Sequence, residues 1–237
     1  MKKRIVFLDA GRVFVTFGER HEVLTRIAVV AHAPHVPTRE DLIQGGILLE
    51  DRGDALEGPY DLIDSGRVSW HELYLKFLSV TGLDSGKLPE FRFWATFCRH
   101  LEPIPEVVAI LEELHTAGIP LVVISNGEFG SLHAADLVSF KYEVRWADVI
   151  VSSLFGKKKP DPAIWNEALR IGKEHVPYLK FGQMVYVDDV LRYCTAFEAH
   201  FPGAHAINFD GTKQPARVLR QALHELGVPF KPLLPSF

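Results

Sequence analysis

The sequence predicts an α/β fold, a doubly wound and mainly parallel sheet flanked by helices, with an inserted helical cap subdomain. Two observations predict it. Short apolar runs alternate with helix-like segments along most of the chain, which is typical of parallel sheets built from strand–helix–strand units. The long segment 18–99, in contrast, contains no convincing strand. We therefore expect an α/β core formed by residues 1–17 and 100–237, and a helical cap formed by residues 18–99.

Five short apolar runs are the predicted strands. The first is "IVFL", which ends directly before Asp9, and the others are rich in β-branched residues. A helix is predicted between the first two strands, because Pro105 suits a first turn, Gly118 suits the end, and the apolar residues between them share one helical face. The four later strands are "LVVIS" (121–125), "DVIVSS" (148–153), "MVYVDD" (184–189) and "AHAINF" (204–209).

The inserted segment contains one strongly patterned helix, "SWHELYLKFLSVTG" (69–82). Ser69 is the predicted N-cap, Glu72 completes a capping box, and Gly82 ends the helix. Pro103 and Pro105 mark the return to the core. The apolar stripe of this helix is predicted to be core, and it consists of Trp70, Leu73, Tyr74, Phe77 and Leu78.

Composition excludes several classes of protein. The 237 residues carry a formal net charge of −4, which gives no reason to expect nucleic acid or a membrane surface as a partner. The basic start is followed by only four apolar residues, too few for a signal peptide or a spanning helix, so we expect cytoplasmic residence. Cys98 and Cys194 lie far apart, which indicates neither a disulfide framework nor a zinc site.

Polar residues follow three of the predicted strands, and a lysine lies in the loop after a fourth. In an open parallel sheet, ligands bind beyond the carboxyl ends of the strands, so we expect these side chains to meet in one crevice. Carboxylates suit Mg²⁺, and a lysine suits phosphoryl oxygens. Each residue alone has an ordinary interpretation as a turn or cap, but together they predict a phosphate site. They are Asp9, Ser125, Asn126, Lys159, Asp188 and Asp189.

Four motifs resemble those of the haloacid dehalogenase (HAD) superfamily of hydrolases, in the family's order. They are "VFLDAGRV", "LVVISNG", "GKKKPDPAIW" and "MVYVDD", and "IDSGRVSWHELYLKFLSVTGL" resembles a helical C1-type cap. The first motif, of the form D-x-G-x-V, is similar to a subgroup that includes glucose-1-phosphatase-like enzymes and epoxide hydrolase N-terminal domains. The resemblance implies a HAD-like Rossmannoid core and a phosphatase.

The resemblance also implies a role for each site residue. Asp9 would be the nucleophile that forms an aspartyl-phosphate, and Mg²⁺ would be held by Asp9, the Gly11 carbonyl and Asp189. Asp188 would bind Mg²⁺ directly, or it would contact a residue or water that binds Mg²⁺.

The phosphoryl group would be bound by residues of motifs two and three. Ser125, Asn126 and the neighbouring backbone would bind phosphoryl oxygens, and Lys159 would neutralise charge and orient the nucleophile. Arg12 follows the proposed metal ligand Gly11, so it either touches the substrate or points into solvent.

The sequence departs from the family pattern at two places. Gly11 stands where most phosphatases of the superfamily have a second aspartate, the general acid, whose loss costs typically ~10²–10⁴ in rate. Substrates with good leaving groups, such as anomeric sugar phosphates, would suffer least. A cap residue, Glu19, His21 or Glu22, is an alternative acid. Tyr193 stands where "DDxxxN" has the asparagine that ties down the motif-four loop.

Three functions are left open. The first is a Mg²⁺-dependent phosphatase, monomeric or homodimeric, that acts on a small phosphorylated metabolite. The second is a non-catalytic or weakly active module that binds a phospho-ligand or a protein, which Gly11 and Tyr193 make credible. The third is a metal-independent 2-haloacid dehalogenase, in which Asp9 would attack carbon. The paired acids Asp188 and Asp189 argue against the third, and we favour the first.

Overall fold

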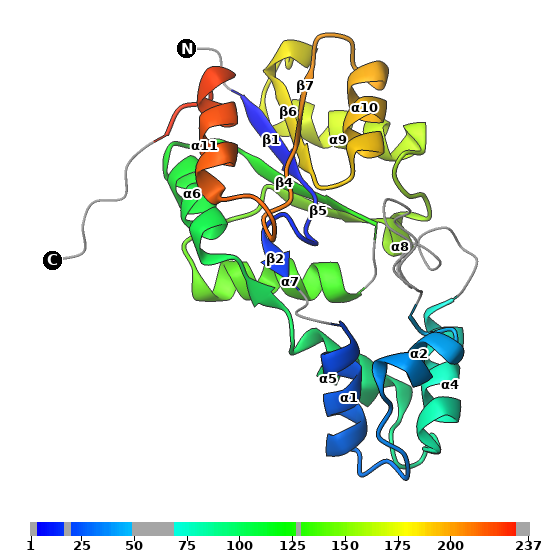
Figure 1. Cartoon of the computed structure of the whole chain (residues 1–237). Helices are drawn as coiled ribbons and strands as arrows, with labels where there is room; N and C mark the ends of the chain where they lie inside the picture. Colours follow the sequence, from blue (N-terminus) through cyan, green and yellow to red (C-terminus); the bar gives the residue numbers. More distant parts are fainter. Residues whose placement is uncertain (1–3, 17–19, 49–68, 127–128, 231–237) are drawn as a thin grey trace, which may run out of the picture. The chain divides into compact units, whose positions relative to one another are not determined.

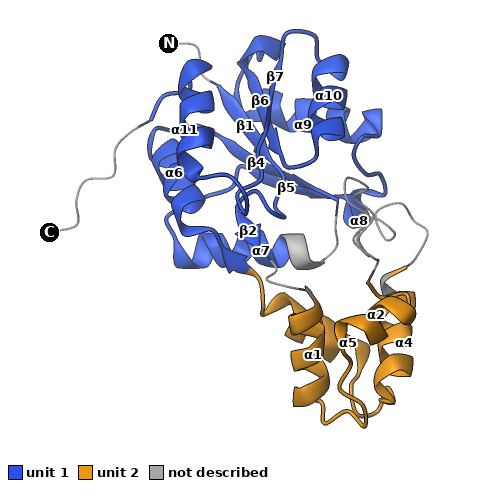
Figure 2. Ribbon diagram, in the orientation of Figure 1, with its two compact units in different colours: residues 1–16, 102–237 blue, residues 17–101 orange. Residues whose placement is uncertain are grey.

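The chain forms two compact units, which Figure 2 shows in different colours. The computed structural model describes residues 4–16, 20–48, 69–126 and 129–230. The first unit comprises residues 1–16 and 102–237, and the second comprises residues 17–101. The segment predicted as a cap, residues 18–99, falls within the second unit.

The first unit is built on a five-stranded sheet whose neighbouring strands all run parallel, in the order β5-β4-β1-β6-β7. This sheet confirms the predicted fold class. The central strand β1 is the first in the chain, so the chain winds outward in both directions from it (Figure 1). The strands are β1 (Ile5–Leu8), β4 (Leu121–Ser125), β5 (Asp148–Val151), β6 (Met184–Asp188) and β7 (His205–Asn208).

Helices cover both faces of this sheet. In Figure 1, α6 and α11 lie together on one side of it, and α9 and α10 lie on the other. The helices are α6 (Pro105–Thr116), α7 (Phe129–Lys141), α8 (Ser152–Phe155), α9 (Pro162–His175), the 3₁₀ turn η1 (Phe181–Gln183), α10 (Leu191–His200) and α11 (Ala216–Glu225).

Helix α6 is the helix predicted from residues 105–118. Its five predicted core residues, Val107, Val108, Ile110, Leu111 and Leu114, are all buried. Pro105 is at the first turn, and Gly118, one residue past the C-cap Ala117, has φ 74°, a conformation that glycine adopts without steric cost.

The face of the sheet under α9 and α10 carries the largest aromatic cluster of the first unit. Tyr186 of β6 packs on Trp165 of α9 and Phe197 of α10, with ring centroids 5.3 and 4.9 Å away. Gly172 lets α9 approach β1 closely, because a Cβ there would lie 3.3 Å from the ring of Phe7 in β1. The cluster fixes α9 and α10 against the strands that end at the site.

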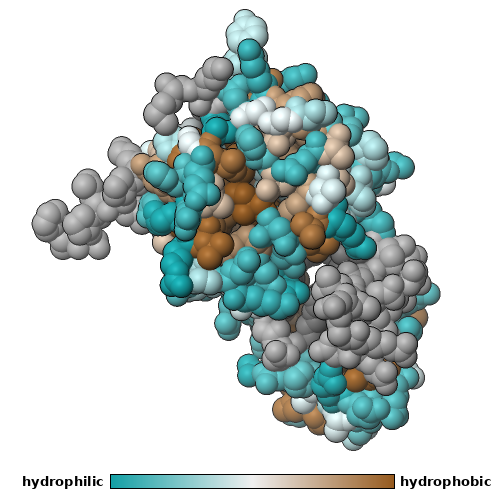
Figure 3. Space-filling model, turned by 45° about the horizontal axis from the view of Figure 1, so that its top comes forward, coloured by the Kyte–Doolittle hydropathy of each residue, from teal (hydrophilic) through white to brown (hydrophobic). Residues whose placement is uncertain are grey.

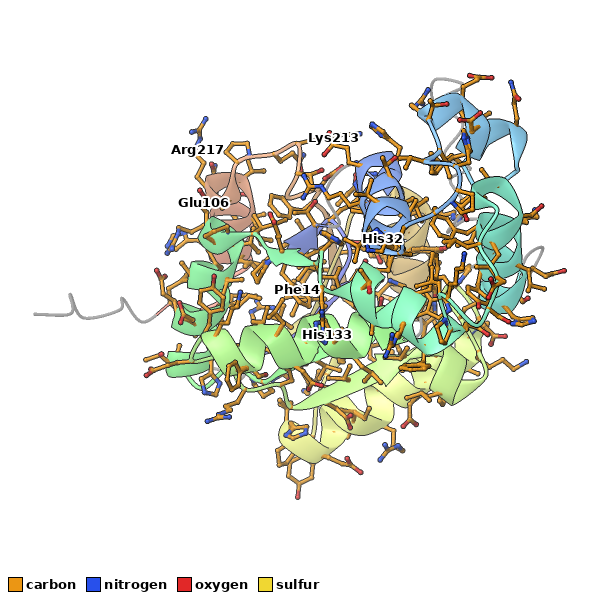
Figure 4. The ribbon with its side chains drawn as sticks, turned by 90° about the horizontal axis from the view of Figure 1, so that it is seen from below. Phe14, His32, Glu106, His133, Lys213 and Arg217 are labelled. Carbon is orange, nitrogen blue, oxygen red and sulfur yellow. The ribbon has the colours of Figure 1, made fainter. Side chains whose placement is uncertain are left out.

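Two very short strands were not predicted. β2 (Val15–Thr16) and β3 (Glu102–Pro103) pair antiparallel at the point where the chain leaves and re-enters the first unit. Phe14, which precedes β2, is fully buried and packs on Trp146 at 5.1 Å between ring centroids. Figure 4 shows Phe14 beside α7, the helix that carries His133.

The second unit contains only helices among its described residues, 20–48 and 69–101. They are α1 (Arg20–Val30), α2 (Arg39–Gln44), α4 (Trp70–Thr81) and α5 (Glu90–Cys98). Helix α4 has the predicted capping box between Ser69 and Glu72, and it ends at Gly82 with φ 67°. Of its predicted stripe, Leu73, Tyr74, Phe77 and Leu78 are buried, and the Trp70 side chain lies outside the described residues.

The surface of the first unit is mixed. β7 is an edge strand, and its residues remain partly exposed. On the face shown in Figure 3, hydrophobic residues gather near α11 and β7.

Among the described residues, we find no helix that combines the length and the apolar character needed to span a bilayer.

The core of the second unit predicts a large difference between two phenylalanines of α5. Phe93 is fully buried among aromatic rings, whereas Phe91 on the same helix is 71% exposed. Phe93→Ala should lower the free energy of unfolding of this unit by about 3–5 kcal/mol, because it leaves a cavity. Phe91→Ala should change it by less than about 0.5 kcal/mol. Urea titrations followed by circular dichroism measure both, and equal losses would contradict this core assignment.

Candidate active site

Three carboxylates meet at the carboxyl ends of two neighbouring strands. Asp9 comes directly after β1, Asp188 is the last residue of β6, and Asp189 follows it. The Asp9 amide donates a hydrogen bond to the Val187 carbonyl at 2.9 Å, which fixes the nucleophile candidate beside the motif-four acids. Carboxylate oxygens of all three residues lie within 4.8 Å of one another. The predicted convergence of these acids is therefore present in the structure.

Lys159 joins two of these acids from the loop between α8 and α9. Its Nζ donates to Asp9 Oδ1 and to Asp188 Oδ2, both at 2.7 Å, and only 2% of the residue is exposed. Burial alone would lower the pKa of Lys159. The charges of Asp188 and Asp9 and the hydrogen bonds to both outweigh burial and raise the pKa above its ordinary value. Lys159 is therefore a buried ammonium group.

Asp188 is held on both of its oxygens. The Tyr186 hydroxyl donates to Oδ2, which also accepts from Lys159, and the Val190 amide donates to Oδ1 at 2.8 Å. These contacts suit a carboxylate that positions Lys159. Of the two alternatives in the sequence prediction, they favour an indirect role for Asp188 at the metal.

Asp9 and Asp189 carry excess negative charge. The pKa of Asp9 is raised from 3.8 to about 6, because burial, together with the charge of Asp188, outweighs the lowering by Lys159. Burial and the charges of Asp9 and Asp188 raise the pKa of Asp189 to about 7. Crowded oxygen ligands of this kind fit a hard divalent cation, which would relieve their repulsion. Mg²⁺ fits the donor set formed by Asp9 and Asp189, to which the family resemblance adds the Gly11 carbonyl.

Arg12 lies beside two acids, Asp189 and Asp210. Its guanidinium pairs with Asp210, and its Nε lies 3.6 Å from Asp189 Oδ2. The backbone of Arg12 has φ 59°, and its carbonyl accepts from the Gly211 amide at 2.6 Å. A Cβ on Gly211 would lie 2.7 Å from the Val13 carbonyl, so this close approach requires glycine. No local pattern indicated Asp210 as the partner, because it lies 198 positions from Arg12.

Ser125 and Asn126 end the strand on the other side of β1. Ser125 is buried as the last residue of β4. Asn126 contacts the loop of motif three, since its Oδ1 accepts from the Lys159 amide at 2.6 Å and its Nδ2 donates to the Lys159 carbonyl at 3.0 Å. The side chain of Asn126 therefore holds Lys159, and the structure does not test its predicted contact with phosphate.

Asn208 does the work for which the pattern "DDxxxN" uses the asparagine at position 193. Asn208, at the end of β7, donates to the Asp188 and Asp189 carbonyls at 3.1 and 2.9 Å and so ties down the motif-four loop. The Tyr193 hydroxyl instead accepts from Asn126 Nδ2 at 3.1 Å. Sequence reasoning missed Asn208, whose only signal was its place at the end of a strand next to β6.

Gly11 leaves the general-acid position without a side chain. It is half-buried and pairs in an isolated bridge with Val15. Of the alternative acids in the cap, Glu19 lies outside the described residues, and His21 and Glu22 belong to the second unit.

The chain belongs to the haloacid dehalogenase-like hydrolase family. Residues 74–193, just over half of the chain, match the model of this family. A search of curated proteins gives no significant match.

Solved structures of HAD enzymes share the fold. The magnesium-bound HAD-hydrolase YfnB from Bacillus subtilis superposes with a TM-score of 0.62 at 13% identity, covering 96% of this chain and 100% of that one. HAD family enzyme bt-2542 from Bacteroides thetaiotaomicron, with magnesium and inorganic phosphate, gives 0.57 at 13% identity, covering 92% and 100%. L-2-haloacid dehalogenase PA0810 gives 0.53 at 18% identity, covering 86% and 83%. At these identities the likeness establishes the fold.

The raised pKa values set the pH at which Mg²⁺ stabilises the protein. Asp9 and Asp189 have pKa values of about 6 and about 7 in the folded protein, against 3.8 ordinarily. Between these values the folded protein holds more protons than the unfolded chain, so their contribution to stability is present below pH 3.8 and is lost as pH rises through 6 and 7. Mg²⁺ binds the deprotonated groups and restores that stability. The rise in melting temperature caused by Mg²⁺ should therefore be several degrees larger at pH 8 than at pH 5.

Scanning calorimetry with Mg²⁺ and with EDTA at both pH values measures this difference. Asp189→Asn should abolish most of the Mg²⁺ effect, whereas Asp148→Asn, at the exposed start of β5, should keep it. An equal rise at both pH values in the wild type would contradict the assignment.

Lys159 should matter for stability as well as for chemistry. Lys159→Met preserves the length of the side chain but leaves two buried carboxylates without their cation, which should cost about 3–5 kcal/mol at pH 8. The loss should shrink at pH 5, where Asp9, whose pKa is raised to about 6, takes up a proton. Lys157→Met, an exposed neighbour paired with Asp161 at 3.7 Å, should cost less than about 1 kcal/mol. Urea unfolding compares the two, and similar losses would refute the buried pairing.

Proposed function

We propose that the protein is a Mg²⁺-dependent phosphatase, which hydrolyses a small phosphorylated metabolite through an aspartyl-phosphate on Asp9. The observation that carries this proposal is the Lys159 ammonium between Asp9 and Asp188, next to Asp189 at the carboxyl ends of β1 and β6. Phosphoryl transfer needs this combination of a positioned nucleophile and concentrated positive charge.

The proposed reaction has two steps. A carboxylate oxygen of Asp9 attacks phosphorus, a bond forms between them, and the bond from phosphorus to the leaving oxygen breaks. The leaving oxygen departs without a proton from position 11, and it then takes up a proton from the solvent to give an alcohol. Water then attacks the same phosphorus, the bond from phosphorus to the Asp9 oxygen breaks, and the proton that water loses passes to the solvent. Inorganic phosphate leaves, and the Asp9 carboxylate is regenerated. Lys159 neutralises charge on Asp9 and the phosphoryl group, and Ser125 binds a phosphoryl oxygen. Bound Mg²⁺ would supply the remaining charge neutralisation.

The substrate class follows from Gly11. Because that position offers no general acid, a leaving group that departs easily without protonation is favoured. An anomeric sugar phosphate meets this condition, and we propose it as the first class to test. We also propose that the enzyme works in the cytoplasm as a monomer or homodimer, without nucleic acid or a membrane as partner.

Structural neighbours support the phosphatase more than the alternatives. Enzyme bt-2542 was solved with magnesium and inorganic phosphate, and YfnB was solved with magnesium. The dehalogenase PA0810 is also a neighbour, so metal-independent dehalogenation is the second candidate. A metal-free reaction would leave the repulsion between Asp9 and Asp189 unrelieved. A module that only binds a phospho-ligand is the third candidate.

The decisive test is hydrolysis of p-nitrophenyl phosphate and a panel of sugar phosphates, with Mg²⁺ and with EDTA. Asp9→Asn changes charge with little change in volume and should lower kcat roughly 10³-fold or more. Asp136→Asn, an exposed position on α7, is the matched control and should retain wild-type activity.

Each alternative has its own signature. Halide release from 2-haloacids in EDTA, lost in Asp9→Asn, would establish the dehalogenase. Absence of any turnover, with phosphate still detected in binding calorimetry, would establish the binding module. A folded Asp9→Asn variant with full phosphatase activity would remove Asp9 as the nucleophile.

A further inference from the structure

We propose that Tyr193 is a positioning residue for Lys159, and that it acts through Asn126. The inference rests on the proposed function, because it concerns how the ammonium of the phosphatase site is held. Tyr193 occupies the position at which the family pattern has an asparagine, so its role cannot be carried over from the family.

The first step of the argument is the clamp on the backbone of Lys159. The amide of Lys159 donates to Asn126 Oδ1 at 2.6 Å, and its carbonyl accepts from Asn126 Nδ2 at 3.0 Å. The Asn126 side chain, at the end of β4, thus holds both the backbone amide and the backbone carbonyl of Lys159 in the motif-three loop. This clamp fixes the backbone from which the buried ammonium extends.

The second step is that Tyr193 holds the clamp. Its hydroxyl accepts from Asn126 Nδ2 at 3.1 Å and from the Arg192 guanidinium at 3.1 Å. Its ring centre lies 5.2 Å from Lys159 Nζ, within the range of a cation–π contact. Only 6% of Tyr193 is exposed, so water does not compete freely for these contacts. Tyr193 therefore touches the lysine with its ring and the lysine's clamp with its hydroxyl.

The third step explains why a tyrosine can stand at this position. An asparagine there would tie down the motif-four loop, but Asn208 already donates to the Asp188 and Asp189 carbonyls. Position 193, in the first turn of α10 directly after those acids, is thereby released for another contact. A longer side chain reaches the motif-two residue Asn126. The Tyr193 hydroxyl contacts Asn126, and Asn126 in turn contacts Lys159, so α10 is linked to motifs two and three.

The contacts of Tyr193 and Asn126 affect catalysis because they position the third N–H of the Lys159 ammonium. Two of the three donors of Lys159 point to Asp9 and Asp188, which leaves one direction in which it can assist the phosphoryl group. A loosened clamp changes that direction in the transition state more than it changes ground-state binding. Loss of the Tyr193 hydroxyl should therefore lower kcat and leave KM nearly unchanged.

The test compares Tyr193→Phe with Tyr178→Phe. The first variant removes the hydroxyl and keeps the ring beside Lys159, and the second removes the hydroxyl of a residue that is 96% exposed. With Mg²⁺ and the best substrate of the panel, Tyr193→Phe should lower kcat about tenfold, the size expected for one lost hydrogen bond, with KM within about twofold of wild type. Tyr178→Phe should match wild type in both constants.

A double-mutant cycle tests whether Tyr193 acts through Asn126. Asn126→Ala removes the clamp, so Tyr193→Phe should add no further loss of kcat in that background. Effects that multiply would show that the hydroxyl acts by another route and would overturn the inference.

Hydrogen exchange gives a readout that does not need activity. The Lys159 amide should exchange about tenfold faster in Tyr193→Phe and in Asn126→Ala than in wild type or Tyr178→Phe. A wild-type protein without phosphatase activity would refute the proposed function. Exchange of the Lys159 amide would still decide whether Tyr193 holds the clamp. Unchanged exchange in Tyr193→Phe would overturn the inference, and so would faster exchange with an unchanged kcat in an active enzyme.

Discussion

The structure of the first unit depends on one buried interaction, the ammonium of Lys159 between the carboxylates of Asp9 and Asp188. A buried charge is tolerated only when it is paired and hydrogen-bonded, and a pair of this kind loses stability when either partner is removed. Its three members come from β1, β6 and the loop before α9, so the ion pair forms only when distant parts of the chain are correctly folded. Assembly of the site therefore requires the folded sheet.

The surrounding contacts serve to hold this interaction in one geometry. Tyr186 and the Val190 amide fix Asp188, Asn126 fixes the backbone of Lys159, and Asn208 fixes the loop that carries the motif-four acids. The aromatic cluster behind β6 packs α9 and α10 against the sheet, which places the loops before and after these helices. Polar networks of this kind are stable only when nearly every member has a partner.

The charges that remain unbalanced indicate what the site binds. Lys159 compensates part of the negative charge, and Arg12 is shared with Asp210, so burial and repulsion keep the pKa values of Asp9 and Asp189 high. A divalent cation and a phosphoryl group together would complete this arrangement of charges. This balance of charge suits the ligands that we propose, and it agrees with the hydrolase family to which the chain belongs.

The sequence by itself determined the parallel α/β sheet, helices α4 and α6, and the strand-end positions of Asp9, Ser125 and Asp188, because apolar periodicity, caps and strand termini are local signals. It could not reveal that Asp210 pairs with Arg12, that Asn208 ties down the motif-four loop, or that Tyr193 meets Asn126. These contacts join residues about 20 to 200 positions apart, and the order of strands in the sheet brings them together. Only the tertiary structure decided them, since no local pattern encodes which loops become neighbours.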